Sequence, residues 1–189
     1  DNNADFASFP LSNTTSKVAG FAYKFTSALG SGSRNNPVFY FTFSVGNPVW
    51  VRLTEAGNIA LMSNTTEVAV GTTILNVGVY YFFEVRLNRS TGLFEVFLNF
   101  DGVGTPVAEV SFNVGAIAGT FQTARWGFFN TISLGGQSLP YIDDIYVHTD
   151  TVFGDTAVLY DFPVSNNAPQ DWVPSSGNAW ERIDNVPVD

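Results

Sequence analysis

The stretch YIDDIYVHTDTVFGD, residues 141–155, concentrates side chains whose types could do chemistry. Carboxylates bind Ca²⁺ or act as acid and base, and a histidine can accept a proton. In an enzyme, this stretch would be a metal site or an acid/base pair, whereas in a strand protein it would be the last strand followed by an acidic turn. The residues concerned are Asp143, Asp144, Asp150, Asp155 and His148, the only histidine of the chain.

Strand alternation limits what Asp143 and Asp144 can do together. The run YIDDIYVH reads as a β-strand, in which adjacent side chains point to opposite faces. The two carboxylates therefore cannot form a same-face pair unless a β-bulge reorients one of them. We expect one aspartate to face solvent and the other to accept backbone N–H groups at a turn or strand end. The alternative is a calcium site in which either residue joins Asp150 and Asp155, although no D-x-D-x-D-G loop is present.

Catalytic arrangements find little support in the sequence. A Ser-His-Asp triad would have to use His148, and GGQSLP (135–140) is not a G-x-S-x-G elbow because Pro140 occupies its last position. Glycoside hydrolysis needs two carboxyl groups at a set separation, whereas Glu84 and Glu95 each stand alone on their strands. We therefore expect an exposed histidine at a strand end and no enzymatic activity.

The composition describes the scaffold that must position these residues. Of 189 residues, 45% are hydrophobic and 15% aromatic, which is enough for a packed core and excludes wholesale disorder. The absence of cysteine excludes disulfides and thiolate zinc sites. A net charge of −9 argues against nucleic acid as a partner, and no apolar run is long enough to span a membrane.

The sequence predicts an all-β sandwich or jelly roll made of short strands separated by turns. The clearest feature is the hairpin YYFFEVRL-NRSTG-LFEVFLN, residues 80–99. Its alternation favours a core face made by Phe83, Val85 and Leu87 with Phe94, Val96 and Leu98. No window reads as a helix. The further strands are expected at 18–27, 37–45, 48–56, 58–63, 66–72, 106–114, 124–131 and 141–148.

The charge distribution divides the chain. Residues 1–142 carry eight acidic and seven basic side chains, whereas residues 143–189 carry nine acidic and one basic side chain. We therefore expect an N-terminal extension at 1–17, a sandwich at 18–148 and an acidic extended arm or linker at 149–189.

The four tryptophans fall into two groups. Trp172 and Trp180 lie in the acidic arm, where they either dock on the sandwich or anchor a neighbouring subunit. Trp50 and Trp126 lie in alternating strands, where they either belong to the core or, if exposed, contact a carbohydrate.

The order of segments resembles the concanavalin A-like (laminin G-like) jelly roll. The matching runs are VWVRLTEAGNIALMS, then TEVAVGTTILNVGVYYFFEVRLNRSTGLFEVFLN with its aromatic pair Tyr80–Tyr81, and finally YIDDIYV. The resemblance implies a jelly-roll sandwich. It also makes calcium the metal to consider, because domains of this kind often bind it.

The C-terminal run resembles a type of virion protein of tailed bacteriophages. In IDDIYV followed by FGDTAVLYDFPVSNNAPQDWVPSSGNAWERIDNVPVD, a DD strand precedes a GD-V strand, a proline, a W-x-P-x-x-G run and a W-x-x-I-D-x-x-P run. The chain departs from this pattern at Phe153-Gly154, where Leu-Gly is more usual. Since such chains often continue further, we expect the sequence to stop at a domain edge.

This resemblance implies a non-enzymatic structural role in the virion, as a capsid decoration, a head fibre or a tail-associated appendage. The expected partners are other virion proteins and further copies of the chain, such as a homotrimer. The alternative is a carbohydrate-binding adhesin module of a tail fibre that recognises a host glycan.

Overall fold

The computed structural model describes residues 5–26, 29, 36–100, 102–127, 140–149 and 151–152. The described residues form β-strands, turns and loops and no helix, as the sequence predicts. The strands are β1 (Asp5–Pro10), β2 (Ser16–Lys24), β3 (Pro37–Phe43), β4 (Val49–Leu53), β5 (Asn58–Ser63), β6 (Thr66–Ile74), β7 (Tyr81–Asn88), β8 (Leu93–Leu98), β9 (Val110–Asn113), β10 (Phe121–Gly127) and β11 (Tyr141–His148).

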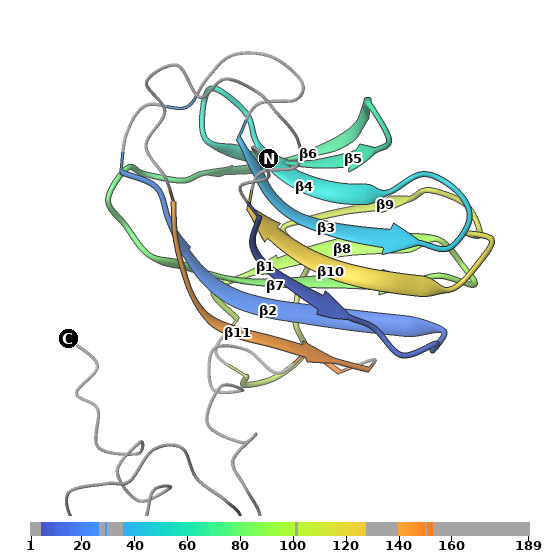
Figure 1. Ribbon diagram of the computed structural model, residues 1–189. Helices are drawn as coiled ribbons and strands as arrows, with labels where there is room; N and C mark the ends of the chain where they lie inside the picture. The colour runs from blue at the N-terminus through green and yellow to red at the C-terminus, as the bar shows by residue number, and fades with distance from the viewer. Residues whose placement is uncertain are drawn as a thin grey trace, which may run out of the picture.

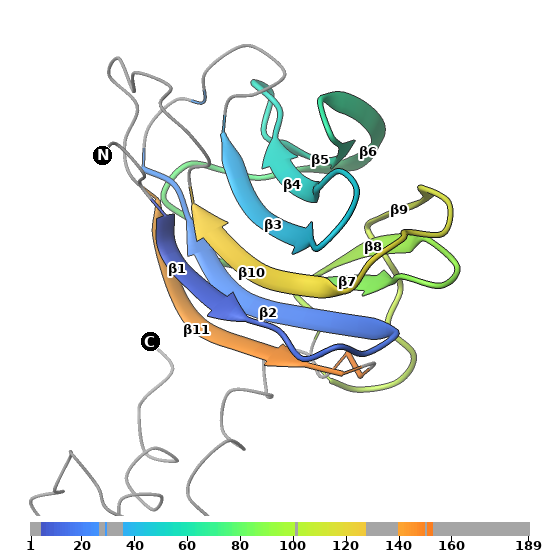
Figure 2. The ribbon, with the colours of Figure 1, turned by 45° about the vertical axis from the view of Figure 1, so that its right-hand side comes forward.

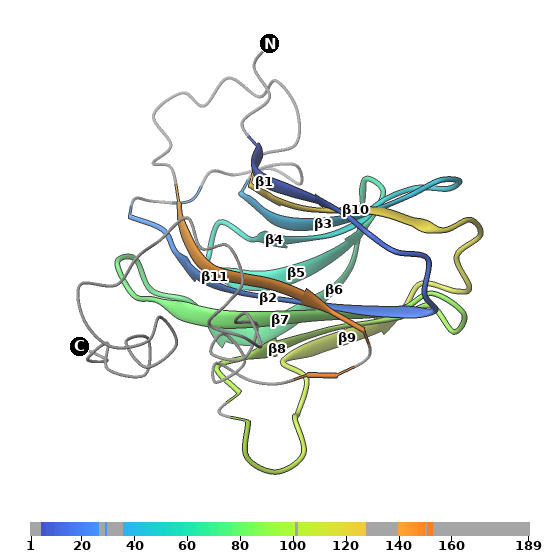
Figure 3. The same ribbon diagram turned by 60° about the horizontal axis from the view of Figure 1, so that its bottom comes forward.

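The strands form two antiparallel sheets that pack face to face as a jelly-roll sandwich. Sheet A has the order β1-β10-β3-β4-β5-β6, and sheet B has the order β11-β2-β7-β8-β9. Figure 1 shows the two sheets one in front of the other, and Figure 3 shows them as two layers. The strands of both layers bend in the same direction, as β1, β10, β2 and β11 show in Figure 2. None of the described residues forms a helix long and apolar enough to cross a membrane.

The core lies between the layers and consists largely of aromatic rings. Phe21 and Phe83 of sheet B stack with centroids 5.3 Å apart, and Phe21 also stacks on Phe39 of sheet A at 5.8 Å. Phe39 in turn meets the Trp126 ring edge-on at 5.1 Å. Because all four side chains are fully buried, these contacts join the two sheets and remove large apolar areas from water.

The predicted hairpin is confirmed as β7 and β8, which pair in register from Phe83–Leu98 to Asn88–Leu93. The side chains predicted for its core face do face the core. Phe83, Val85, Leu87, Phe94 and Val96 are fully buried, and Leu98 packs on the core while partly buried.

The N-terminal boundary differs from the prediction. Residues 1–17 were expected to precede the sandwich, but β1 pairs with β10 in sheet A and β2 already begins at Ser16. The prediction missed β1 because DFASFP is a short edge strand that ends in proline, which is a weak strand signal. Of the predicted arm at 149–189, all but residues 149, 151 and 152 lie outside the described residues.

A carboxylate joins the two sheets on the side where β6 and β9 approach one another. Glu109, just before β9, accepts hydrogen bonds from the backbone N–H groups of Thr72 and Thr73 at 2.7 Å each and from the Thr73 hydroxyl at 2.8 Å. Gly71 makes room for this contact, since a Cβ there would lie 2.6 Å from Glu109 Oε1. Glu109 thus satisfies N–H groups on the edge strand of sheet A.

Candidate functional site

The acidic strand β11 contains a bulge between Asp143 and Tyr146. Asp143 pairs with Ala22 and Tyr146 pairs with Gly20, so two residues of β11 oppose one residue of β2. Asp144 takes the left-handed conformation within this bulge, with φ +53°. The bulge that was named as the exception to plain alternation is therefore present, and both aspartates are exposed. As expected, one of them, Asp143, accepts a backbone N–H group.

The Asp144 carboxyl at the bulge is affected by its surroundings and by Asp143. Burial, followed by the negative charge of Asp143, raises the pKa of Asp144 above its ordinary value. Asp143 Oδ1 accepts a hydrogen bond from the backbone N–H of Asp144 at 2.9 Å, which fixes the orientation of the Asp143 carboxylate. The bulge therefore presents one oriented carboxylate next to a second that is harder to ionise.

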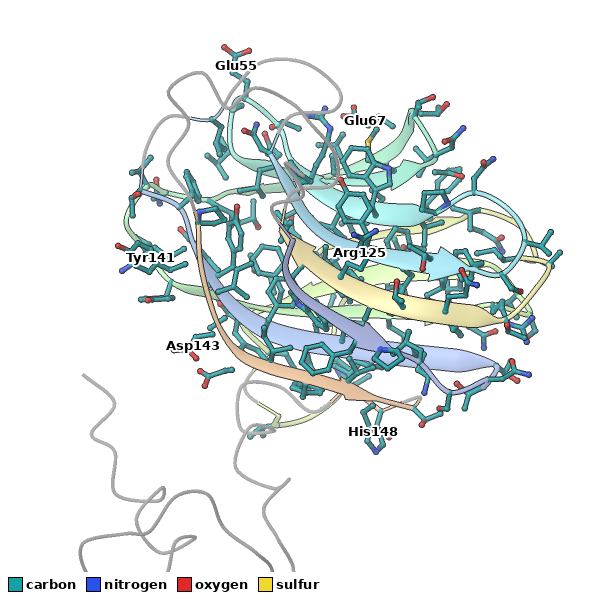
Figure 4. The ribbon with its side chains drawn as sticks, viewed as in Figure 1. Glu55, Glu67, Arg125, Tyr141, Asp143 and His148 are labelled. Atoms are coloured by element: carbon teal, nitrogen blue, oxygen red, sulfur yellow. The ribbon has the colours of Figure 1, made fainter. Side chains whose placement is uncertain are left out.

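No metal site assembles among the described residues. That part of the chain holds no group of three or more His, Cys, Asp or Glu side chains placed to bind a metal. Asp150 and Asp155, the other predicted calcium ligands, lie outside it. His148 is exposed at the opposite end of β11 from Tyr141, away from Asp143 (Figure 4).

Trp50 and Trp126 do not offer faces to a carbohydrate. Trp126 is fully buried against Phe21 and Phe39, where its ring belongs to the core. Trp50 is 4% exposed, stacks on Tyr40 with centroids 5.2 Å apart and donates from Nε1 to the carbonyl of Asn64 at 2.6 Å. The predicted sugar-contacting role of both residues is corrected, because a buried ring cannot stack on a sugar. Trp172 and Trp180 lie outside the described residues.

A tyrosine holds β11 in position at the edge of sheet B. The Tyr146 ring lies over Gly20 of β2, and its hydroxyl donates a hydrogen bond to Glu84 Oε1 of β7. Glu84 is 1% exposed, so this contact helps to satisfy a carboxylate with almost no access to solvent. Only glycine at position 20 leaves room for the ring, which ties β11 across β2 to β7.

The exposed surface at the start of β11 carries two tyrosines and a lysine, named here the tyrosine–lysine cluster (Tyr80, Lys24 and Tyr141). Lys24 Nζ lies 4.2 Å from the centroid of the Tyr80 ring and 4.8 Å from that of Tyr141. Both rings are exposed, by 50% and 56% respectively. Such cation–π contacts are worth about 0.5–1 kcal/mol each at exposed sites, enough to hold the ammonium beside the rings.

Three strands bring the cluster together. Tyr141 opens β11 and pairs with Lys24 at the end of β2, while Tyr80 directly precedes β7, where Tyr81 pairs with Tyr23 of β2. Tyr81 is only half-buried, but its hydroxyl accepts a hydrogen bond from the backbone N–H of Asn76 at 2.9 Å, which leaves Tyr80 as the exposed member of the pair. The sequence shows the aromatic pair but not Lys24 or Tyr141 beside it, because residues 24, 80 and 141 are brought together only by strand pairing.

The cluster can bind a ligand that has a flat apolar face and polar edges. The ring faces supply apolar contact area, and the Lys24 ammonium and tyrosine hydroxyls supply hydrogen-bond partners. Asp143 projects from the same side of β11 as Tyr141, as Figure 4 shows. The described residues include two other exposed aromatic side chains, Phe9 on β1 and Phe112 on β9. Within the described part of the chain, no lysine lies over either of these rings.

Comparison with known proteins identifies the fold and no family. No family model matches the sequence, and no curated protein matches it significantly. The solved structure of the cellulose induced protein Cip1 has a TM-score of 0.53 and 15% identity over 73% of this chain and 69% of its own. A Trypanosoma rangeli sialidase in complex with sialic acid has a TM-score of 0.50 and 8% identity over 70% of this chain but 20% of its own.

A third similar structure, the carbohydrate binding module CBM66 from Bacillus subtilis, has a TM-score of 0.48 and 9% identity over 76% of this chain and 78% of its own. Identities this low establish shared architecture alone. The two antiparallel sheets and the match to Cip1 show the all-β jelly-roll sandwich fold that the sequence predicts.

Proposed function

We propose that the chain is a carbohydrate-binding β-sandwich that acts by recognition and not by catalysis. The observation that carries this proposal is the tyrosine–lysine cluster, in which Tyr80 and Tyr141 expose their rings around one ammonium. Exposed aromatic rings on a folded surface are unusual enough to indicate a binding role when they occur together.

A sugar ring matches what the cluster offers. One face of a pyranose carries C–H groups that pack on an aromatic ring, and its edge carries hydroxyl groups that accept from an ammonium and donate to oxygen. Phosphate-rich ligands match less well, since one lysine is a poor phosphate-binding surface on a chain of net charge −9. A glycan therefore uses both properties of the cluster at once.

The test compares Tyr141→Ala and Tyr80→Ala with the wild-type protein, first on a glycan array and then by calorimetry with the glycan that binds most tightly. Loss of one stacking ring should weaken binding about fivefold or more, if the contact is worth at least the roughly 1 kcal/mol at the low end of base–aromatic stacking. The matched control is Phe112→Ala, which removes a 39% exposed aromatic from β9.

Thermal unfolding of the three variants should stay close to that of the wild type, because exposed side chains contribute little to folding. Equal glycan binding by wild type and both tyrosine variants would contradict the assignment of this surface. A loss of glycan binding in Phe112→Ala as large as that in the tyrosine variants would also contradict this assignment.

The absence of catalysis is part of the same proposal. In the described hairpin, Glu95 contacts Arg86 Nη2 at 2.7 Å and Glu84 accepts from Tyr146, so each carboxylate has its own structural contact. A hydrolase would need two carboxyl groups facing one substrate. Incubating the bound glycan with the protein and measuring reducing ends should show none above background, and sustained release would refute this part.

A structural role in a virion is the second candidate, favoured by the phage-like run at residues 142–189. In this role the sandwich presents the cluster outward while other virion proteins, or further copies of the chain, hold it on the particle. Imaging of intact particles should place the protein on the capsid shell or on a tail fibre. Its absence from purified particles would refute the virion role and leave carbohydrate binding untouched.

A further inference from the structure

We infer that the glycan bound at the tyrosine–lysine cluster is electrically neutral and that Asp143 contacts it, accepting hydrogen bonds from its hydroxyl groups. This inference rests on the proposed function and specifies its ligand class. The position and the charge of Asp143 relative to Lys24 determine this preference.

Asp143 stands beside the cluster on the same exposed face. It follows Tyr141 by two residues on β11, so its side chain points to the same side and lies about 7 Å along the strand. Figure 4 shows both side chains projecting from one side of β11. Opposite Asp143, Ala22 of β2 presents only a methyl group, so no bulky side chain of β2 stands between the carboxylate and a ligand resting on Tyr141.

The Asp143 carboxylate is oriented before any ligand arrives. Its Oδ1 atom accepts from the Asp144 backbone N–H at 2.9 Å within the bulge. Carboxylate oxygens have several lone-pair sites, so this contact leaves acceptor capacity for a hydroxyl group. A fixed acceptor loses less rotamer freedom on binding than a free one, which favours affinity.

Lys24 and Asp143 together offer one donor and one acceptor of opposite charge. Among the described residues, Lys24 makes no ion pair and contacts the two tyrosine rings instead. Adjacent sugar hydroxyls can accept from the ammonium and donate to the carboxylate at the same time, a pattern that an uncharged polyol satisfies fully.

An acidic sugar would meet a different balance of charge. Its carboxylate would be attracted by Lys24 but repelled by Asp143 and Asp144, which are adjacent in the bulge of β11. Two carboxylates against one ammonium favour the neutral ligand. The negative charge of the chain as a whole acts in the same direction.

The test uses matched glycan pairs: galactose-terminated oligosaccharides with their sialic-acid-capped forms, and cello-oligosaccharides with their uronate forms. The neutral member of the pair that binds should bind at least about tenfold more tightly than its acidic counterpart. In Asp143→Asn, affinity for the neutral member should fall about tenfold, as expected when a hydrogen bond to a charged group is weakened.

Asp144→Asn is the matched control because it removes the same charge one residue away and leaves the Asp143 acceptor in place. It should reduce discrimination against the acidic member and leave affinity for the neutral member within about twofold of wild type. Asparagine tolerates the left-handed conformation at this position, so the bulge should persist.

The possible outcomes separate this inference from the proposed function. Tighter binding of the acidic member, or unchanged neutral binding in Asp143→Asn, overturns the inference while the loss of binding in Tyr141→Ala still supports the carbohydrate-binding role. Binding of no glycan on the array, these pairs included, overturns both.

Discussion

A methyl group added at Gly20 should destabilise the protein by pushing Tyr146 away from Glu84. A Cβ at position 20 would lie 2.7 Å from Tyr146 Cδ1 and closer still to Cε1 and Cζ. Since carbon atoms pack at about 3.5–4.0 Å, the ring must move by roughly 1 Å or more. The hydroxyl group then loses its hydrogen bond to Glu84.

The expected loss of unfolding free energy in Gly20→Ala follows from two effects. Overpacking of this kind costs about 1–3 kcal/mol, and a lost hydrogen bond to a charged group costs about 1.5–3 kcal/mol. Because movement of the ring relieves part of the overlap, the effects do not add fully. We expect Gly20→Ala to lower the free energy of unfolding by about 2–5 kcal/mol, a large share of the stability of a typical domain.

A double-mutant cycle isolates this contact from other consequences of the substitution. In a Tyr146→Ala background the added methyl group has no ring to meet, so Gly20→Ala should be neutral or should stabilise by about 0.5–1 kcal/mol, as alanine does in place of glycine inside a strand. The sign of the effect thus changes with the residue at position 146.

Urea denaturation of the four proteins, with the slope m required to stay constant, measures each free energy. Hydrogen exchange over residues 141–148 should accelerate in Gly20→Ala if β11 is the element that loosens. An equal cost of Gly20→Ala in both backgrounds would refute the role given to the Tyr146 ring, as would a cost below about 0.5 kcal/mol in the wild-type background.

Three further predictions concern other parts of the sandwich. Trp126→Ala should cost about 3–5 kcal/mol of stability in urea denaturation because it empties a fully buried site, and any glycan binding should persist in the fraction that stays folded. Glu109→Ala should cost about 1–3 kcal/mol and speed hydrogen exchange at the Thr72 and Thr73 amides, whereas unchanged exchange there would show that the carboxylate does not protect them. Asp144→Asn should be more stable than wild type at pH 7, because the raised pKa means that the ionised carboxyl disfavours the folded state. That difference should shrink as the pH falls through the raised folded pKa and vanish below the ordinary aspartate pKa of 3.8. Denaturation at pH 7 and at about pH 3 measures it, and an equal difference at both pH values would refute this reasoning.

The local sequence pattern was sufficient to predict those strands in which apolar and polar residues alternate strongly. The hairpin of β7 and β8 and the burial of Phe83, Val85 and Phe94 follow from period-two alternation around a polar turn. β1 escaped detection because an edge strand pairs on one side only and needs no strong pattern of its own. The tryptophans show the limit of this reasoning. Alternation predicts that a strand has an inner and an outer face, but it does not predict that Trp50, on the outer face of sheet A, is also buried.

The sequence by itself determined the all-β class and the absence of any cysteine chemistry, because these depend on residue types and on spacing along the chain. The jelly-roll fold was indicated by a resemblance in the order of the segments, and the strand order within each sheet came from the structure. Only the tertiary structure decided which residues share a surface. Lys24, Tyr80 and Tyr141 are distant in sequence and become neighbours because β2 pairs with both β11 and β7. The bulge at Asp143–Tyr146 likewise arises from the register that Gly20 and the Tyr146 ring allow, which no local pattern encodes.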